Sequence, residues 1–168
     1  MRYSSYTWLA INEGLKSAEN LALRGILITP ACYLCQNEDE SSSHMFFQCP
    51  FSFSILHSLL PDVRGFLLRP NLLQLFEHFE DCQSIEGAEC NFCYFVICCT
   101  LYFLWRERND RRYGGKYSTI HTLCHKISMA ITAKVSKWKY FDKLQKAFPN
   151  CFFWRNYHQA ENFDIPRQ

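Results

Sequence analysis

Hydrophobic residues recur at helical spacing along most of the chain. In the segment that follows Ser118, apolar side chains repeat at steps of three and four, as on the buried face of an amphipathic helix. Those side chains are Ile120, Cys124, Ile127, Ile131, Val135 and Trp138. Residues 85–112 predict another long helix, apolar at first and strongly charged afterwards, and Gly114-Gly115 separates the two. No segment alternates as a strand does, so the pattern predicts a mainly α protein.

Boundary residues predict shorter helices in the first half. Ser17 suits the cap of a helix that Gly25 would end. Pro50 suits the first turn of a helix that Pro61 would stop, and Asn71 suits the cap of a further short helix. An apolar cluster near the start predicts one more helix, and it consists of Trp8, Leu9 and Ile11.

The chain is thus expected to consist of a small helical module followed by a helical extension. The module spans residues 1–60, and residues 61–84 form a connector with a short helix. Residues 85–147 form two long basic helices. Residues 148–168 form a tail without periodicity, which we expect to lie loosely on the surface.

The composition is that of a globular protein that folds without a membrane and without disulfides. It has 168 residues, of which 48% are hydrophobic and 20% charged. The longest apolar run, residues 92–105, is shorter than the roughly 18–25 residues that span a membrane, and it predicts a buried core helix. The start of the chain lacks the apolar core of a signal peptide. We therefore expect an intracellular, reducing compartment, with nucleus and cytoplasm left open, in which the ten cysteines are metal ligands or core residues.

Three of those cysteines and one histidine have the spacing of a zinc site. Cys32 and Cys35 are separated by two residues. A polar loop of eight residues leads from Cys35 to His44, and four residues separate His44 from Cys49. Thiolates and imidazole are the ligands that zinc prefers, and four of them complete its tetrahedron. With no open coordination position, the predicted site holds one structural Zn²⁺ and is not catalytic. The front of the chain is expected to fold only with this metal, whereas the helices beyond residue 85 survive its loss.

The segment from Cys32 to Ser52 resembles the zinc-binding domain that follows the reverse transcriptase in plant LINE-type (non-LTR) retrotransposons. That family typically reads C-x-x-C, a short acidic loop, E-[ST]-x-x-H, two or three apolar residues and a final cysteine. Residues 6–60 are similar to this domain, and the Trp-Arg-Glu-Arg-Asn run at 105–109 resembles a segment that often follows it. The resemblance implies zinc on the four ligands named above, and a role with nucleic acid.

Charge is sorted along the sequence although the net charge is only +2. Residues 1–104 contain five Lys/Arg and eleven Asp/Glu, whereas residues 105–147 contain eleven and three. If RNA or DNA is bound, electrostatics places it on residues 106–146. The candidates for phosphate contact are Arg108, Arg111, Arg112, Lys134 and Lys137. The alternative is a solvated helix end with ion pairs such as Glu107–Arg111, and a lysine face that serves solubility alone.

Other cysteines leave further alternatives open. Cys90 and Cys93 form a second C-x-x-C, to which His121 and His125 would add ligands for a second metal site. The competing interpretation is core packing, because three cysteines of the apolar run, expected to be buried and inert, have hydrophobic neighbours. They are Cys93, Cys98 and Cys99.

The sequence lacks the catalytic carboxylates of the enzymes with which such a domain is associated. No Asp-Asp pair is present, and the chain has no room for a polymerase palm or a ribonuclease H domain. We therefore expect a non-enzymatic accessory domain that binds nucleic acid. The alternatives are a protein-interaction or structural module without affinity for nucleic acid, which includes a degenerate retroelement remnant, and a thiol enzyme.

Overall fold

The computed structural model describes residues 2–60, 69–81, 87–152 and 154, and in these residues the fold is mainly α. The elements are α1 (Arg2–Ile11), α2 (Ala18–Ala22), the helical turn η1 (His44–Gln48), α3 (Pro50–Leu59), α4 (Leu72–Asp81), α5 (Gly87–Gly114), α6 (Ile120–Val135) and α7 (Phe141–Ala147). The predicted fold class is confirmed. Pro61 and Gly65, at the predicted module boundary, lie outside the described residues.

Helix starts follow the capping chemistry that the sequence predicts. The Ser17 hydroxyl accepts a hydrogen bond from the Asn20 amide at the start of α2. Asn71 and Gln74 exchange side chain–backbone hydrogen bonds of 2.9 Å at the start of α4. Pro50 occupies the first turn of α3. The cap of α6 is Thr119, whose hydroxyl accepts from the Thr122 amide.

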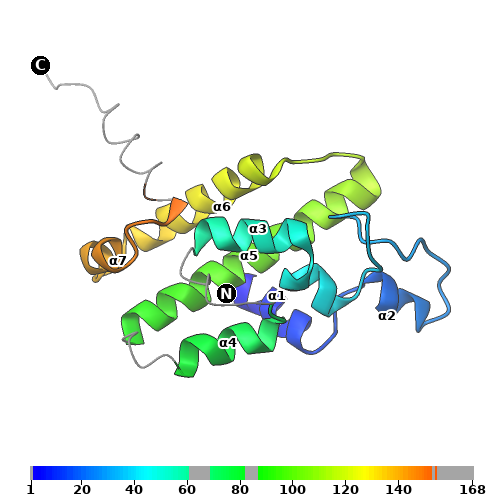
Figure 1. Cartoon of the computed structure of the whole chain (residues 1–168), viewed down its shortest axis with the longest axis horizontal. Helices are drawn as coiled ribbons and strands as arrows, with labels where there is room; N and C mark the ends of the chain where they lie inside the picture. Colours follow the sequence, from blue (N-terminus) through cyan, green and yellow to red (C-terminus); the bar gives the residue numbers. More distant parts are fainter. Residues whose placement is uncertain (1, 61–68, 82–86, 153, 155–168) are drawn as a thin grey trace, which may run out of the picture.

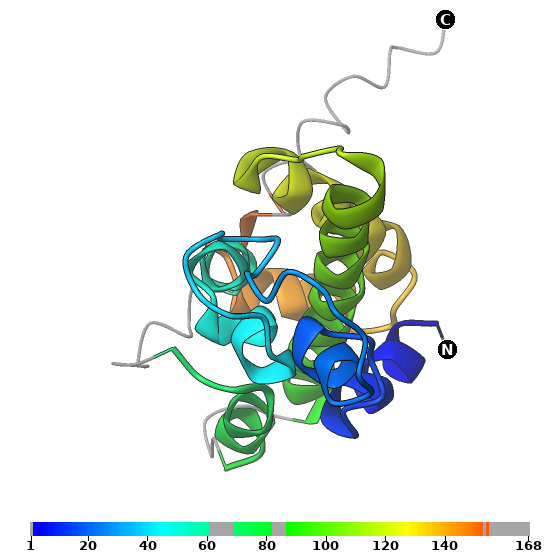
Figure 2. The same cartoon turned by 90° about the vertical axis from the view of Figure 1, so that its right-hand side faces the viewer.

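The long helix α5 is the centre of the molecule. Figure 1 shows it running across the whole fold, and Figure 2 shows the other helices arranged around it. Helices α1, α3, α4, α6 and α7 and the turn η1 all contact it. By length and composition α5 is apolar enough to cross a membrane, and half of this apolar stretch is buried in the structure.

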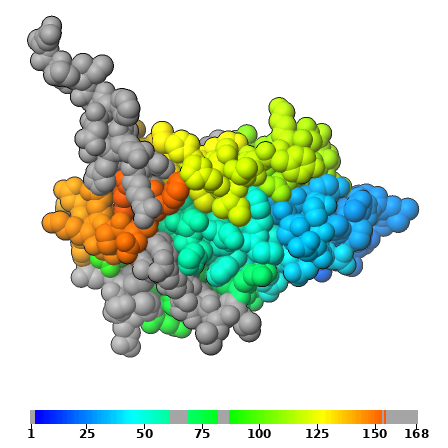
Figure 3. Space-filling view, turned by 45° about the horizontal axis from the view of Figure 1, so that its top comes forward, coloured from blue at the N-terminus to red at the C-terminus, as the bar shows by residue number. Residues whose placement is uncertain are grey.

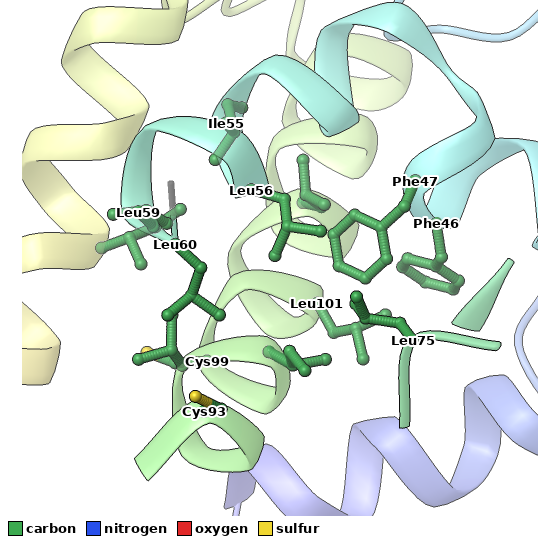
Figure 4. Packing of buried hydrophobic residues seen from close by; sticks show 14 of the residues in the cluster. Phe46, Phe47, Ile55, Leu56, Leu59, Leu60, Leu75, Cys93, Cys99 and Leu101 are labelled. Carbon is green, nitrogen blue, oxygen red and sulfur yellow. The ribbon is translucent and has the colours of Figure 1, made fainter. Parts of the chain in front are cut away.

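One hydrophobic core joins the front of the chain to its back. Phe46 and Phe47 of η1 and Leu56 of α3 are buried and point toward Leu101 of α5, with Leu75 of α4 beside them (Figure 4). The core continues from there to α6 and α7. The predicted module of residues 1–60 therefore does not have a core of its own.

The basic region after α5 contains two helices where one was expected. The predicted continuous helix to residue 147 breaks after Val135, and the chain turns through residues 136–140 before α7 begins. The turn brings the Trp138 ring against Phe95 of α5, with ring centroids 5.4 Å apart, and it allows Leu144 to be buried. Packing of these apolar side chains thus overrides the helical preference of the lysine-rich segment.

The start of the predicted loose tail is part of the core. Cys151 and Trp154 are buried, and the Trp154 ring stacks on Phe92 at 6.0 Å and meets Phe141 edge-on at 5.6 Å. The expectation of a loose tail is therefore wrong for these positions, because the aromatic side chains cover apolar surface that α5 and α7 leave open. Residues 155–168 lie outside the described part of the chain.

Candidate metal centre

The first two predicted ligands lie on a tight hairpin, residues 31–39, which we call the zinc knuckle. Ala31 and Asp39 form an antiparallel bridge, and the Cys32 amide donates to the Glu38 carbonyl at 2.8 Å. The Gln36 amide donates back to the Cys32 carbonyl at 2.8 Å, with Gln36 in the left-handed region at φ 61°. This turn closes the hairpin around Cys32 and Cys35, so that their sulfur atoms face one point.

The other two ligands are set by the turn η1. The backbone leaves helical geometry at Phe46 and Phe47, where Phe47 has φ 85°, and it returns so that the Cys49 amide donates to the His44 carbonyl at 2.7 Å. The Phe47 amide donates to the Ser52 hydroxyl of α3 at 3.1 Å. Since both phenylalanines are buried, the core fixes a strained turn that places His44 and Cys49 beside the knuckle.

The four side chains meet with the geometry of a zinc site. Their ligand atoms all lie within 4.8 Å of one another, and His44 Nε2 is 3.3 Å from Cys35 Sγ. A zinc tetrahedron with Zn–S bonds of about 2.3 Å has edges of roughly 3.8 Å, so the cluster needs only a slight contraction around the ion. Three of the four residues are buried and Cys35 is half-buried. One structural zinc ion fits this closed Cys3His set, and the set leaves no coordination position for a substrate.

Hydrogen bonding prepares these ligands for the metal. A hydrogen bond from the Cys32 thiol lowers the pKa of Cys49 to about 5, and the same contact raises the pKa of Cys32. Of the two thiols, Cys49 is thereby the one that loses its proton more readily. Glu38 Oε2 lies 3.3 Å from His44 Nδ1, which leaves Nε2 as the nitrogen that faces the sulfur atoms. A carboxylate on the second nitrogen is the usual way to orient a zinc-binding histidine, and the spacing of the ligands in the sequence does not indicate this role of Glu38.

The comparison with protein families agrees with this geometry. Residues 1–55 match the family model described as zinc-binding in reverse transcriptase. Residues 1–55 are a reverse-transcriptase-type zinc-binding domain. All four ligands lie within it. No curated protein and no solved structure matches the chain. The family is one of accessory domains, and the matched segment ends before α5 begins.

The zinc-binding domain is tied to α5 by a buried ion pair. Glu40, one residue beyond the knuckle, and Arg108 of α5 are both fully buried. Arg108 Nε donates to the two carboxylate oxygens at 3.1 and 2.9 Å, and Nη2 donates to Oε1 at 2.5 Å. Glu40 Oε1 also accepts from the Ala18 amide at the start of α2. A single carboxylate therefore joins the knuckle to α2 and to α5.

Arg111 makes a second connection, to the backbone of the knuckle itself. Its Nη1 donates to the Leu34 carbonyl at 2.8 Å and to the Tyr33 carbonyl at 3.3 Å, between the two cysteines of the C-x-x-C. Its Nε donates to Glu107 at 2.9 Å, and Glu107 also accepts from the Ser118 amide at 2.6 Å. The predicted Glu107–Arg111 pair is confirmed. We call Glu40, Glu107, Arg108 and Arg111 the latch.

These contacts correct part of the predicted phosphate-binding set. Arg108 and Arg111 were expected to project from a polar helix face, but they are buried because Glu40, Glu107 and the knuckle carbonyls bind them. Arg112 is half-buried, with its guanidinium near the rings of Tyr33 and Tyr113. Lys134 and Lys137 are exposed, as expected.

The remaining cysteines do not form a second metal site in the described residues. The one group there with suitably close ligand atoms is the zinc cluster, so Cys90, Cys93, His121 and His125 are not brought together. Cys90 Sγ donates to the Phe79 carbonyl at 3.5 Å, and His121 and His125 are exposed.

Two of the three cysteines of the apolar run are buried as expected, and the third is only half-buried. Cys93 and Cys99 are fully buried and Cys98 is half-buried. Desolvation raises the pKa of Cys98, which keeps that thiol protonated at neutral pH. Burial also raises the pKa of Cys124, to about 11. Such protonated thiols are poor nucleophiles, which disfavours the thiol-enzyme hypothesis.

Proposed function

We propose that this chain is a zinc-stabilised, nucleic-acid-binding accessory module of a LINE-type reverse transcriptase, without polymerase activity of its own. The matched family is an accessory one, and the sequence lacks an Asp-Asp pair for catalytic metal ions. The zinc has a structural role in this proposal. Thiolate ligands and buried cysteines suit a reducing, intracellular environment.

The exposed charge of residues 106–146 carries the proposal. This region contains eleven Lys/Arg and three Asp/Glu. When the buried Arg108, Arg111 and Glu107 are set aside, nine basic and two acidic side chains remain, and eight of the basic ones are exposed. The latch thus buries two arginines and one glutamate of residues 106–146, and the rest of this region keeps an excess of positive charge.

The position of the basic surface relative to the zinc knuckle supports the same function. In Figure 3 the knuckle region and α7 lie at opposite ends of the molecule, with α6 between them. Glu38 and Asp39 are exposed at the knuckle end, where they repel phosphate. We infer that the backbone of RNA or DNA follows the exposed lysines of α6, the 136–140 turn and α7. They are Lys126, Lys134, Lys137, Lys139, Lys143 and Lys146.

A charge-matched pair of variants tests this function. Lys134→Ala/Lys137→Ala removes two exposed positive charges from the basic surface, and Lys16→Ala/Arg24→Ala removes two from the acidic front. Each lost phosphate contact lowers the slope of log affinity against log salt by roughly 0.7–0.9. The first variant should reduce the slope by about 1.5, while the second should leave it unchanged. Equal effects of the two variants, or no binding to any oligonucleotide at low salt, would contradict the proposal.

A second candidate function, protein interaction, is favoured by an exposed apolar segment at the front. Leu23, Ile26 and Leu27 are 80%, 48% and 99% exposed. Their sequence neighbours Ala22 and Ile28 help to line a pocket of about 300 Å³ between α2 and the knuckle, together with Glu19 and Asp39. An apolar partner segment with basic flanks fits this surface. This candidate gains weight if the protein binds no nucleic acid and Leu23→Ser/Leu27→Ser, but not Lys134→Ala/Lys137→Ala, abolishes association with such a peptide.

A further inference from the structure

The described surface contains a pocket that is lined in part by aromatic side chains of the lysine-rich turn between α6 and α7. It lies between the start of α5 and the turn from α6 to α7, and its volume is about 370 Å³. Its lining consists of Ala88, Asn91, Trp138, Lys139, Tyr140 and Leu144. Apart from Lys139 and Asn91 the walls are apolar or aromatic, which is unusual for a site within so basic a surface. We propose that this pocket holds an unpaired nucleobase of a single-stranded nucleic acid.

The aromatic side chains are arranged to receive a planar group. The Trp138 ring packs against Phe95 on its core side, at 5.4 Å, so the indole is held in place before a ligand arrives. Tyr140 is 51% exposed at the rim, and its ring is approached by Lys139 Nζ at 5.8 Å. Buried Leu144 completes the apolar wall. A base that enters between these side chains replaces water on the tyrosine and indole surfaces and gains stacking energy.

Polar groups at the pocket match the remaining parts of a nucleotide. The exposed Asn91 carries both an amide donor and an amide acceptor, which suit the edge of a base. Exposed Lys137 and Lys139 lie in the same turn, and Lys134 precedes it on α6, so phosphates on both sides of the base meet positive charge. Of the acidic side chains near this wall in sequence, Asp142 is exposed in the first turn of α7, and Glu89 lies 3.9 Å from Lys143. Its charge is thereby offset by a lysine.

This architecture favours single strands over duplexes. In a duplex the base faces are stacked on one another and cannot enter a side pocket without unpairing. The inference rests on the proposed function, because it assigns the base-contacting part of the same surface. Removal of the Tyr140 ring should lower the affinity for single strands without changing the salt dependence of binding, because Tyr140 carries no charge.

Binding of a fluorescent oligo(dT) strand by the full chain tests the pocket. Tyr140→Ala should weaken binding by about 5- to 150-fold, the range for loss of one stacked base, at an unchanged salt slope. Tyr140→Phe should retain wild-type affinity. Tyr113→Ala removes a tyrosine that is 71% exposed at the end of α5, outside the pocket, and it serves as the matched control with wild-type affinity. An abasic strand of equal length should bind the wild type as weakly as oligo(dT) binds Tyr140→Ala.

The outcomes separate this inference from the proposed function. The base pocket is overturned by three results together. Tyr140→Ala binds oligo(dT) as tightly as the wild type does, and the wild type binds the abasic strand and a duplex as tightly as oligo(dT). A slope that still depends on Lys134 and Lys137 would then leave the phosphate-binding surface intact. If neither single strand nor duplex binds at low salt, both proposals fail. Circular dichroism of each variant establishes that the exposed Tyr140 substitutions leave the fold unchanged.

Discussion

The two ends of α5 are stabilised by different chemistry. At its C-terminal end, Arg108 and Arg111 bind the zinc domain through a buried carboxylate and backbone carbonyls. At its N-terminal end, Phe92 contacts the rings of Phe148 and Trp154, and Phe95 contacts Trp138. The comparison shows that a basic helix end need not face solvent, because the same helix can end in a buried polar junction.

The composition of the polar loop between Cys35 and His44 explains the difference. Residues 36–43 contain no apolar side chain, so this segment cannot be held by hydrophobic burial. Zinc and the Glu40–Arg108 pair take that role, whereas the opposite end has enough aromatic surface to need neither. We infer that the latch makes the zinc-binding domain and α5 one cooperative unit.

Loss of zinc should have the largest effect. Structural zinc contributes on the order of 10 kcal/mol of apparent folding free energy in small modules, which is comparable to the whole stability of a domain. Cys49→Ser should therefore unfold the knuckle and greatly lower the urea midpoint measured by circular dichroism. Cys98→Ser changes a half-buried thiol outside the site and should cost about 1 kcal/mol with zinc retained. Equal urea midpoints for the two variants would contradict a structural role for the metal.

Breaking the latch should have the next largest effect. Arg108→Met leaves the buried Glu40 carboxylate without its cation, and we expect a loss of about 3–5 kcal/mol in the free energy of unfolding. Arg106→Met, an exposed position two residues away, should change it by less than about 0.5 kcal/mol. Adding Glu40→Met to Arg108→Met should recover part of the loss. Equal stabilities of the two arginine variants would contradict a stabilising role for the Glu40–Arg108 pair at the C-terminal end of α5.

At the aromatic end, Trp154→Ala should cost about 3 kcal/mol, because it removes a large buried side chain. Trp8→Ala is the control, since Trp8 is 64% exposed on α1 and its loss should be nearly neutral. Thermal unfolding of both variants checks the contrast. A Trp154 variant as stable as the Trp8 variant would restore the expectation of a loose tail.

Glu38 should have the smallest effect, confined to the metal. Glu38→Ala removes the carboxylate from His44 Nδ1, and loss of such an outer partner lowers metal affinity by about 10- to 100-fold. Asp39→Ala removes the adjacent exposed carboxylate, which does not contact the ligands, and should leave the affinity unchanged. Competition with a chromophoric chelator measures both. Equal losses would indicate a general effect of acidic charge near zinc.

Local sequence signals were sufficient for the metal ligands and most helix starts. The C-x-x-C spacing and the caps at Ser17, Asn71 and Pro50 involve residues within a few positions of each other, so the sequence displays them directly. The break at Ser136 has no comparable local signal, because packing of Trp138 and Leu144 decides it.

The latch could not be predicted in the same way, because Glu40 and Arg108 are 68 positions apart. A signal nevertheless exists in the periodicity of α5. Buried Ile97, Leu101 and Leu104 continue at steps of four and three to Arg108 and Arg111, so both arginines lie on the core face of the helix. Charge alone suggests that they face solvent, whereas their register indicates burial.

Amide hydrogen exchange of the full chain, with and without a zinc chelator, tests the coupling between the zinc-binding domain and α5. If the latch couples the two regions, chelation should remove protection from the knuckle and, in the same step, from the end of α5 around residues 104–111. The aromatic end of α5 around residues 92–99 should lose less. Loss of protection confined to residues 31–49, with residues 104–111 unchanged, would contradict cooperative unfolding of the two regions.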